Sequence, residues 1–273
     1  MVSAAVVFLL TISSVCGEAA ARKLEYVTVV SSQSLPYRPT PREQLATRMG
    51  MQEQFGLGQF LRKRYKGFLN DFYDRHEIYI RSTDQDRTLM SAEANLAGLY
   101  PPTGHQVFKE NLMWQPIPVH TVSQSEERLL SFPLGDCPRY EQLMNETKRT
   151  EEFINVTNTY QDIIELVKKK TGLNEINVES VWSVYDTLFC ESRHNMSAPD
   201  WVTPDVMEKL SVLNDFSIQP PFASCQIFEL YRNNDSSVSV SMFYRNDSTV
   251  EPYPLQLPGC SLDCPLDEFM RIT

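Results

Sequence analysis

Arg81 stands where a short apolar strand should end and a helix should begin, which is a place where proteins often bind anions. Residues 77–80 before it read as a short strand whose last three residues are aromatic or β-branched. The pairs Ser82/Gln85 and Thr83/Asp86 after it have the spacing of a helix-capping box. Backbone N–H groups at a helix start attract an anion, and a guanidinium group fits phosphate with two parallel hydrogen bonds. The pattern therefore predicts phosphate binding at Arg81, with an ordinary surface ion pair as the alternative.

A second strand end is notable for what it lacks. Residues 25–30 read as a short buried strand, and Ser31, Ser32 and Gln33 follow it without a histidine, a glycine or an acid. The chain has four histidines, and none of them precedes an aspartate: His76, His105, His120 and His194. A replacement nucleophile would need phosphate-binding groups converging on it, so we interpret these histidines as structural.

The elements that must position these residues alternate between strand and helix. An amphipathic helix with Gly56 and Gly58 in its middle is expected over residues 43–68, and a second helix from about Ser82 to Gly98. This order predicts an α/β fold whose mostly parallel sheet is flanked by helices. Later segments add helices over 151–170 and 174–186, and a hairpin made by 226–231 and 238–244. The expected division is a signal peptide at 1–20, α/β domain at 21–104 and 217–273, and a smaller helical region at 105–216.

The composition is that of a globular protein, with 42% apolar and 22% charged residues in a chain of 273. A formal net charge of −10 argues against nucleic acid and against an anionic membrane surface as partners. The apolar run that starts the chain predicts a secretory signal peptide, with a buried N-terminal helix as the alternative. No later stretch has the length of a membrane span.

Glycosylation signals and cysteines agree with an oxidising, exported environment. The Asn-X-Ser/Thr pattern makes five asparagines candidate acceptors: Asn145, Asn155, Asn195, Asn234 and Asn246. Beyond Cys16 in the expected leader, Cys260 and Cys264 can close a small loop, and Cys190 and Cys225 can form a long-range bridge. Spacing alone does not assign these pairs, and this pairing leaves Cys137 without a partner.

Several segments resemble the histidine acid phosphatases of the prostatic, lysosomal and testicular branch. These segments are IYIRSTDQDRTLMSAEANLAGLYPP (78–102), LMWQPIPVHTV (112–122), DCPRY (136–140), WSVYDTLFCESRHN (182–195), PPFASCQIFELY (220–231) and EPYPLQLPGCSLDCPLDEF (251–269). The resemblance covers 24–30, about 44–212, and 220–269. It implies an incomplete histidine phosphatase-like fold, hydrolysis of phosphate monoesters at acid pH through a phosphohistidine, and no cofactor.

The same resemblance shows which groups are missing. It implies an Arg-His-Gly motif where this chain has Ser31, Ser32 and Gln33, with the histidine as nucleophile and Arg81 among the phosphate-binding arginines. It also implies a His-Asp pair, supplying phosphate binding and the proton for the leaving alcohol, in a segment absent between Phe216 and Ser217. The cysteine that the resemblance pairs with Cys137 lies beyond Thr273. We therefore expect a chain without an intact catalytic site.

Three functions follow as hypotheses. The first is a catalytically impaired acid phosphatase relative, arising as a splice product or an incomplete gene model. The second is a working phosphatase with a rearranged site centred on Arg81, and the third is a secreted glycoprotein that forms homodimers or dimers with full-length relatives. The expected location is the secretory pathway, ending in the lysosomal lumen or outside the cell. Patterns typical of metal, nucleotide or nucleic-acid sites are absent from the sequence.

Overall fold

The computed structural model describes residues 5–11, 22–32, 36–40, 43–130, 138–173, 175–193, 195–216, 223–246 and 249–273. The chain forms two compact units: a sheet unit, Val2–Pro133 with Pro221–Thr273, and a helical unit, Leu134–Pro220. Residues 105–130 thus lie in the sheet unit rather than in the helical region where the sequence pattern put them. The reason is that this segment, irregular after the short 3-10 helix Gly104–Gln106, bonds to the sheet unit. His120 pairs with the backbone of Arg81, and the Gln115 side chain donates to the carbonyl of Tyr100.

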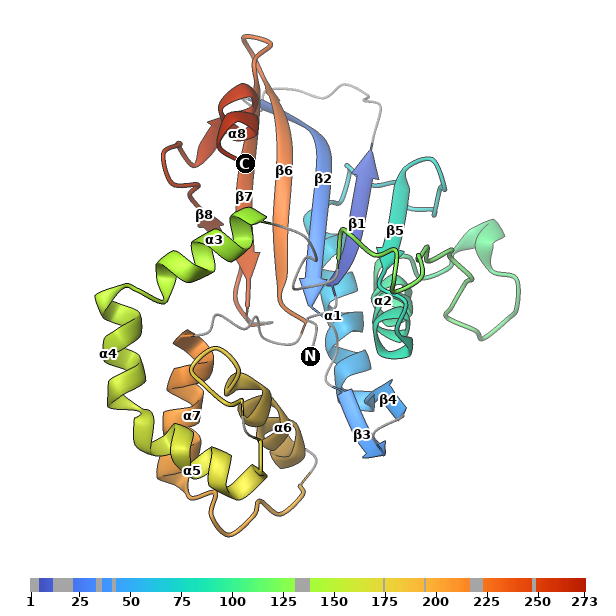
Figure 1. The fold of residues 1–273 in the computed structure, drawn as a ribbon. Helices are drawn as coiled ribbons and strands as arrows, with labels where there is room; N and C mark the ends of the chain where they lie inside the picture. The colour runs from blue at the N-terminus through green and yellow to red at the C-terminus, as the bar shows by residue number, and fades with distance from the viewer. Residues whose placement is uncertain are drawn as a thin grey trace. The chain divides into compact units, whose positions relative to one another are not determined.

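One large sheet has the order β5-β1-β2-β6-β7-β8, with β9 also paired to β7 (Figure 1). Its strands are β1 (Ala5–Thr11), β2 (Arg22–Ser32), β5 (Ile78–Ser82), β6 (Cys225–Asn233), β7 (Val238–Arg245), β8 (Tyr253–Leu255) and β9 (Asp263–Pro265). A separate pair is formed by β3 (Pro36–Thr40) and β4 (Glu43–Ala46). The expected strands at 25–30 and 77–80 and the expected hairpin at 226–244 are confirmed.

All neighbouring strands of the large sheet in the described residues are antiparallel, so the prediction of a mostly parallel sheet is wrong. The strands β2 and β5 do run in the same direction, because β1 lies between them and is antiparallel to both. The predicted order of strand, helix, strand and helix matches β2, α1, β5 and α2, with the pair β3 and β4 added before α1. Periodicity does not reveal which strands become neighbours. The strand β1 falls in the apolar run expected to be a leader, since both kinds of segment have the same composition.

Two helices, α1 (Arg48–Arg64) and α2 (Asp86–Leu99), cover one face of the sheet (Figure 1). Thr47 caps α1 by accepting a hydrogen bond from the N–H of Gly50 at 3.1 Å, and three basic residues complement the dipole of the last turn. The helix therefore starts later than the expected position 43, which belongs to β4. At α2 the cap residue is Gln85, whose side chain makes no capping bond, so neither expected capping box forms.

The backbones of α1 and α2 touch where both helices carry glycine. A Cβ atom on Gly58 would lie 2.0 Å from the carbonyl oxygen of Asn95, and one on Gly98 would lie 2.2 Å from that of Phe55. No other residue type allows this approach. The contact fixes α1 and α2 as one layer over the sheet.

The core of the sheet unit lies between this helical layer and the strands. Its buried members are Val27, Val29, Leu57, Leu61, Tyr65, Leu69, Ile78, Ile80, Ala92, Leu96, Leu99, Tyr100, Cys225 and Ile227. The Glu229 carboxylate is buried at its margin and accepts hydrogen bonds from Arg64, Tyr65 and Tyr231. Burial and the adjacent Glu229 charge raise the pKa of the Tyr65 hydroxyl, so it remains a donor that ties the end of α1 to β6.

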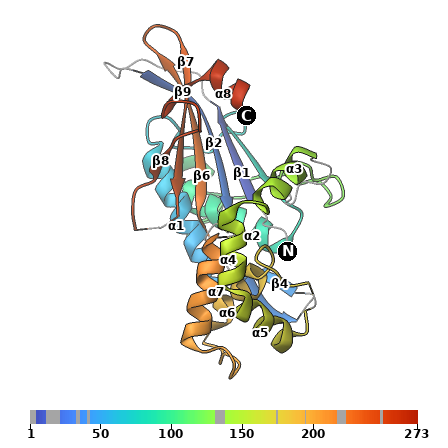
Figure 2. The ribbon, with the colours of Figure 1, turned by 60° about the vertical axis from the view of Figure 1, so that its left-hand side comes forward.

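The helical unit contains α3 (Pro138–Thr147), α4 (Glu151–Thr159), α5 (Gln161–Thr171), α6 (Trp182–Arg193) and α7 (Pro204–Phe216), shown in Figure 2. The single helix expected over 151–170 is two helices that meet at Tyr160. The helix expected from 174 begins at Trp182, because Asn177 uses its side-chain oxygen in a local turn, accepting the N–H groups of Glu179 and Ser180. The buried apolar side chains of α5, α6 and α7 form a second core, separate from that of the sheet unit.

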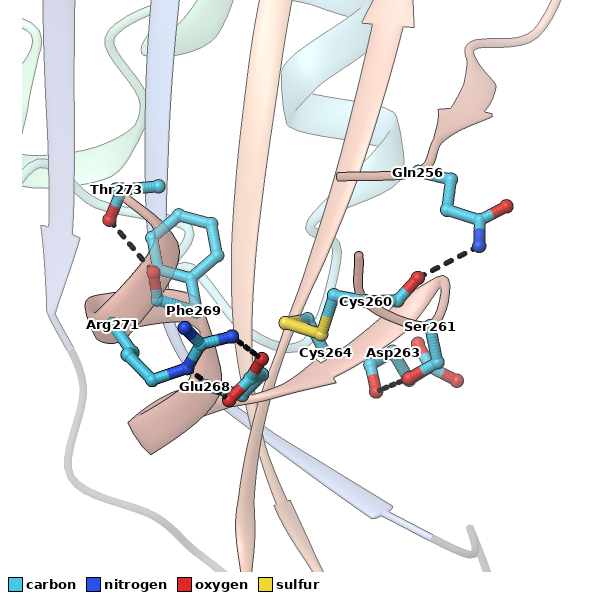
Figure 3. The surroundings of a disulfide bond; sticks show 9 residues. All are labelled: Gln256, Cys260, Ser261, Asp263, Cys264, Glu268, Phe269, Arg271 and Thr273. Atoms are coloured by element: carbon cyan, nitrogen blue, oxygen red, sulfur yellow. Dashed lines mark hydrogen bonds and ion pairs between the residues drawn. A yellow bond between two sulfur atoms is a disulfide. The ribbon is translucent and has the colours of Figure 1, made fainter. Parts of the chain in front are cut away.

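The C-terminal segment packs onto β7 through β8, β9 and the helix α8 (Leu266–Ile272). A disulfide joins Cys260 to Cys264, which is buried on β9 (Figure 3). Gln256 donates to the carbonyl of Cys260 at 2.8 Å, and Ser261 donates to that of Asp263 at 2.7 Å. The structure thus contains the small disulfide loop that the cysteine spacing suggested.

Candidate anion-binding site

Arg81 lies at the carboxyl end of β5, where its side chain is 21% exposed. Its Nη2 atom donates to both carboxylate oxygens of Glu127, at 3.1 Å and 3.0 Å. Its Nε atom is buried and has no hydrogen-bond partner among the described residues. Arg81 thus makes an ion pair, but with a buried carboxylate and not the surface pair considered above, and its Nε donor has no acceptor in the described part of the chain.

Glu127 is the residue of this site that the sequence did not reveal. Its side chain is 1% exposed, and its Oε1 atom also accepts the N–H groups of Leu129 at 2.7 Å and Leu130 at 2.9 Å. Burial by itself would raise the pKa of Glu127, but these two N–H groups and Arg81 outweigh it, so the pKa lies below its ordinary value. No spacing rule connects a glutamate in an irregular segment with an arginine 46 positions earlier.

His120 continues the sheet beside Arg81 through its backbone. Its N–H donates to the carbonyl of Ile80, and its own carbonyl accepts the N–H of Ser82, both at 2.9 Å. Its ring stacks on Tyr79 with 4.7 Å between centroids. His76 accepts a hydrogen bond from Arg75, and His105 contacts Phe72. None of these contacts involves the guanidinium of Arg81, while His194 lies outside the described residues.

The carboxyl end of β2 lies level with that of β5. Ser31 and Ser82 both pair with Val6 of β1, and Val30 and Arg81 both pair with Val7. Because side chains alternate along a strand, Ser32 and Arg81 project from the same face of the sheet, and Ser31 projects from the other. The structure therefore places Ser32, where the family resemblance expects the nucleophilic histidine, on the face that carries Arg81.

The backbone at this end of β2 is firmly held. The N–H of Ser32 donates to the carbonyl of Ser224 at 2.9 Å, and its carbonyl accepts from the fully buried Gln54 side chain at 2.8 Å. The Ser31 hydroxyl is buried and has no hydrogen-bond partner among the described residues. Gln33 lies outside the described residues. Among its described residues, this strand end offers the Ser32 hydroxyl on the face of Arg81 and no imidazole.

The remaining predicted sites are separate from Arg81. All five candidate glycosylation asparagines are exposed, which leaves Asn145, Asn155, Asn195, Asn234 and Asn246 as predicted acceptors. Cys190 in the helical unit and Cys225 in the sheet unit are buried thiols, so a bridge between them stays a prediction. Cys137 lies outside the described residues.

Two kinds of feature are absent from the described part of the chain. No group of His, Cys, Asp and Glu side chains there has the arrangement of a metal site. None of the helices described is both long and apolar enough to cross a bilayer.

Some known proteins are similar to this chain in sequence, and others in fold alone. The family model "Histidine phosphatase superfamily (branch 2)" matches residues 26–218. Lysosomal acid phosphatase of Homo sapiens is 44% identical over 290 residues, which cover 83% of this chain and 69% of the relative. Prostatic acid phosphatase of Mus musculus is 36% identical over 342 residues, which cover 97% of this chain and 90% of the relative. The fold is similar to that of Hafnia alvei phytase, with a TM-score of 0.59 at 14% identity over 93% of this chain and 97% of that structure.

Proposed function

Because this chain belongs to branch 2 of the histidine phosphatase superfamily, we propose that it binds phosphate monoesters at Arg81 but hydrolyses them far more slowly than a member with an intact nucleophile. The observation that carries this proposal is the residue at position 32. A serine stands there, on the sheet face of Arg81, where the family resemblance implies the histidine that accepts the phosphoryl group. Loss of such a nucleophile costs several orders of magnitude in rate.

The lengths of the alignments support a second loss. The alignment with prostatic acid phosphatase spans 342 residues, more than the 273 of this chain, so the relative has stretches that this chain lacks. The resemblance puts one such stretch between Phe216 and Ser217, with the His-Asp pair inside it. Without that pair, no acid is supplied to the leaving alcohol.

The test compares hydrolysis of an aryl phosphate at acid pH by this chain and by a version with the Arg-His-Gly and His-Asp segments restored. We expect a rate at least about a thousandfold lower for the natural chain, and no labelled phosphoenzyme after quenching in alkali, which preserves a phosphohistidine. A phosphohistidine trapped from the natural chain, or turnover that Arg81→Ala abolishes, would establish the rearranged phosphatase instead.

A non-catalytic secreted glycoprotein is the second candidate. The five exposed acceptor asparagines favour it, as do exposed apolar side chains in one loop of the sheet unit: Val107, Phe108, Leu112, Met113 and Trp114. Such a surface suits a homodimer or a dimer with full-length relatives. Light scattering of the glycosylated secreted protein tests this function, and a strict monomer, alone and with a full-length relative, contradicts it.

The location proposed with both functions is the secretory pathway, ending in the lysosomal lumen or outside the cell. The relatives named lysosomal acid phosphatase and the predicted signal peptide at 1–20 support it. Secretion of an endoglycosidase-sensitive product from cultured cells is the expected result.

A further inference from the structure

We propose that Glu127 controls the anion affinity of the Arg81 site: its carboxylate holds the guanidinium and cancels much of its charge, so that a phosphate group must compete with Glu127. This inference rests on the proposed binding of phosphate at Arg81. It makes Glu127 a positioning residue with an inhibitory effect, since it acts on the ligand only through Arg81.

The carboxylate keeps its place without help from Arg81. Its Oε1 atom accepts the N–H groups of Leu129 and Leu130 at 2.7 Å and 2.9 Å, and its side chain is 1% exposed. Segment 123–130 therefore folds around this charge, and the charge faces Arg81 whether or not an anion is present. A carboxylate on an exposed, unanchored side chain would swing away and exert little effect.

The guanidinium is only partly used by this pair. Both contacts with Glu127 go through Nη2, while Nε is buried and lacks a partner in the described part of the chain. Because a buried donor without an acceptor costs free energy, Nε favours an acceptor that can reach it. An incoming anion meets an arginine whose positive charge is already balanced by the Glu127 carboxylate, with 3.0 Å between Nη2 and Oε2.

Removing the Glu127 charge while keeping its shape should strengthen anion binding. In Glu127→Gln the amide oxygen can take the place of Oε1 and accept from Leu129, Leu130 and Arg81, while the amide nitrogen at the place of Oε2 is a donor and no longer accepts from Arg81. The guanidinium thus keeps one of its two bonds to this residue. Loss of one negative charge a few ångströms from a bound phosphate is expected to tighten its binding about tenfold at low salt. A residue with a purely structural role would give weaker binding or none when altered.

The experiment is a titration of the full chain with inorganic phosphate at pH 7, followed by calorimetry. Glu126→Gln is the matched control, because it changes the net charge equally at an adjacent exposed residue that accepts from Ser123 rather than Arg81. We expect Glu127→Gln to bind phosphate about tenfold more tightly than the natural chain and Glu126→Gln to stay within about twofold. Equal or weaker binding by Glu127→Gln overturns the inference.

Two further variants separate this inference from the proposed function. The double variant Glu127→Gln with Arg81→Gln must lose the increase in phosphate affinity, because Glu127 acts on the anion through Arg81. If the natural chain binds no phosphate but Glu127→Gln binds it in an Arg81-dependent manner, the proposed function fails and the inference holds. If none of the variants binds phosphate, both fail. Should Glu127→Gln not fold, Glu127→Asp withdraws the carboxylate by one methylene group, and unchanged or weaker phosphate binding by it overturns the inference.

Discussion

Ser31 and Ser82 pair with the same residue, Val6, from opposite sides of β1. Adjacent strands lie about 4.8 Å apart, so the carboxyl ends of β2 and β5 are level and about 10 Å from each other. A side chain of histidine length at the end of β2 and the guanidinium at the end of β5 could both contact one phosphate group between them. Under the proposed function, we therefore expect the residue at position 32, rather than any remaining histidine, to decide whether the chain is catalytic.

The pairing of β1 with β2 predicts a specific cross-link. In the full chain, Val7→Cys with Val30→Cys should oxidise to a disulfide, because Cα atoms of paired antiparallel residues lie about 4.5–5.5 Å apart. Val7→Cys with Thr28→Cys is out of register by two residues and should stay reduced. Peptide mass mapping of chains shown to retain residue 7 checks both variants. Equal cross-linking of the two pairs would contradict the register.

The close approach of α1 and α2 predicts opposite effects for two glycine substitutions. Gly98→Ala should lower the free energy of unfolding by about 3 kcal/mol, because its Cβ would lie 2.2 Å from a backbone oxygen. A Cβ atom on Gly56 has no neighbour within 4 Å, so Gly56→Ala should raise the free energy of unfolding by up to about 1 kcal/mol through helix propensity. Urea denaturation followed by circular dichroism measures both changes. Similar effects of the two substitutions would mean that the helices do not meet as described.

Breaking the Arg81–Glu127 pair should be costly for stability. Arg81→Ala leaves a buried carboxylate without its cation and is expected to lower the free energy of unfolding by about 3 kcal/mol. Lys148→Ala removes an exposed partner of Glu179 in the helical unit and should cost less than about 1 kcal/mol. Denaturant titrations of both variants provide the comparison, and equal losses would contradict the burial of Glu127.

Glu127 also predicts how this stability depends on pH. Its folded-state pKa is below the ordinary 4.5, so the ionised group stabilises the fold above about pH 4.5, and this stabilisation is lost as the pH falls through the lowered value. The stability difference between the natural chain and Glu127→Gln should therefore be constant from pH 7 to 5 and shrink at lower pH. Thermal unfolding across this range measures it. A stability difference between the two proteins that grows as the pH falls would contradict the lowered pKa of Glu127.

Glu77 predicts the reverse behaviour. Burial, with a contribution from Asp74, raises its pKa above 4.5, against the opposing effects of the Asn70 N–H, Arg62 and Tyr100. The folded state therefore prefers the protonated acid, and ionisation of Glu77 costs stability as the pH rises from 4.5 through the folded-state pKa. Glu77→Gln should be more stable relative to the natural chain at pH 7 than at pH 4. A relative loss of stability at pH 7 would show that the ionised form is favoured.

Local sequence patterns predicted many of the strands and helices but not which distant segments pair with each other. The strands around Val29 and Ile80 and the helix containing Leu96 follow from periodicity, because each buries one face. Two facts that shape the site depend on contacts distant in sequence: Glu127 reaching Arg81, and β1 separating β2 from β5. Neither fact leaves a periodic signal in the sequence. Glu127 lies in an irregular loop, and β1 lies in an apolar run whose composition also fits a signal peptide.

The position of β1 links processing to the integrity of the sheet. A peptidase that removed the first twenty residues would take out a central strand and leave a gap one strand wide, lined on both sides by the backbone donors and acceptors of β2 and β5. A molecule that keeps these residues has a sealed sheet, whereas a cleaved molecule has two open edges facing each other. Export with cleavage and an intact sheet are thus mutually exclusive in a single copy of this chain, unless another strand fills the gap.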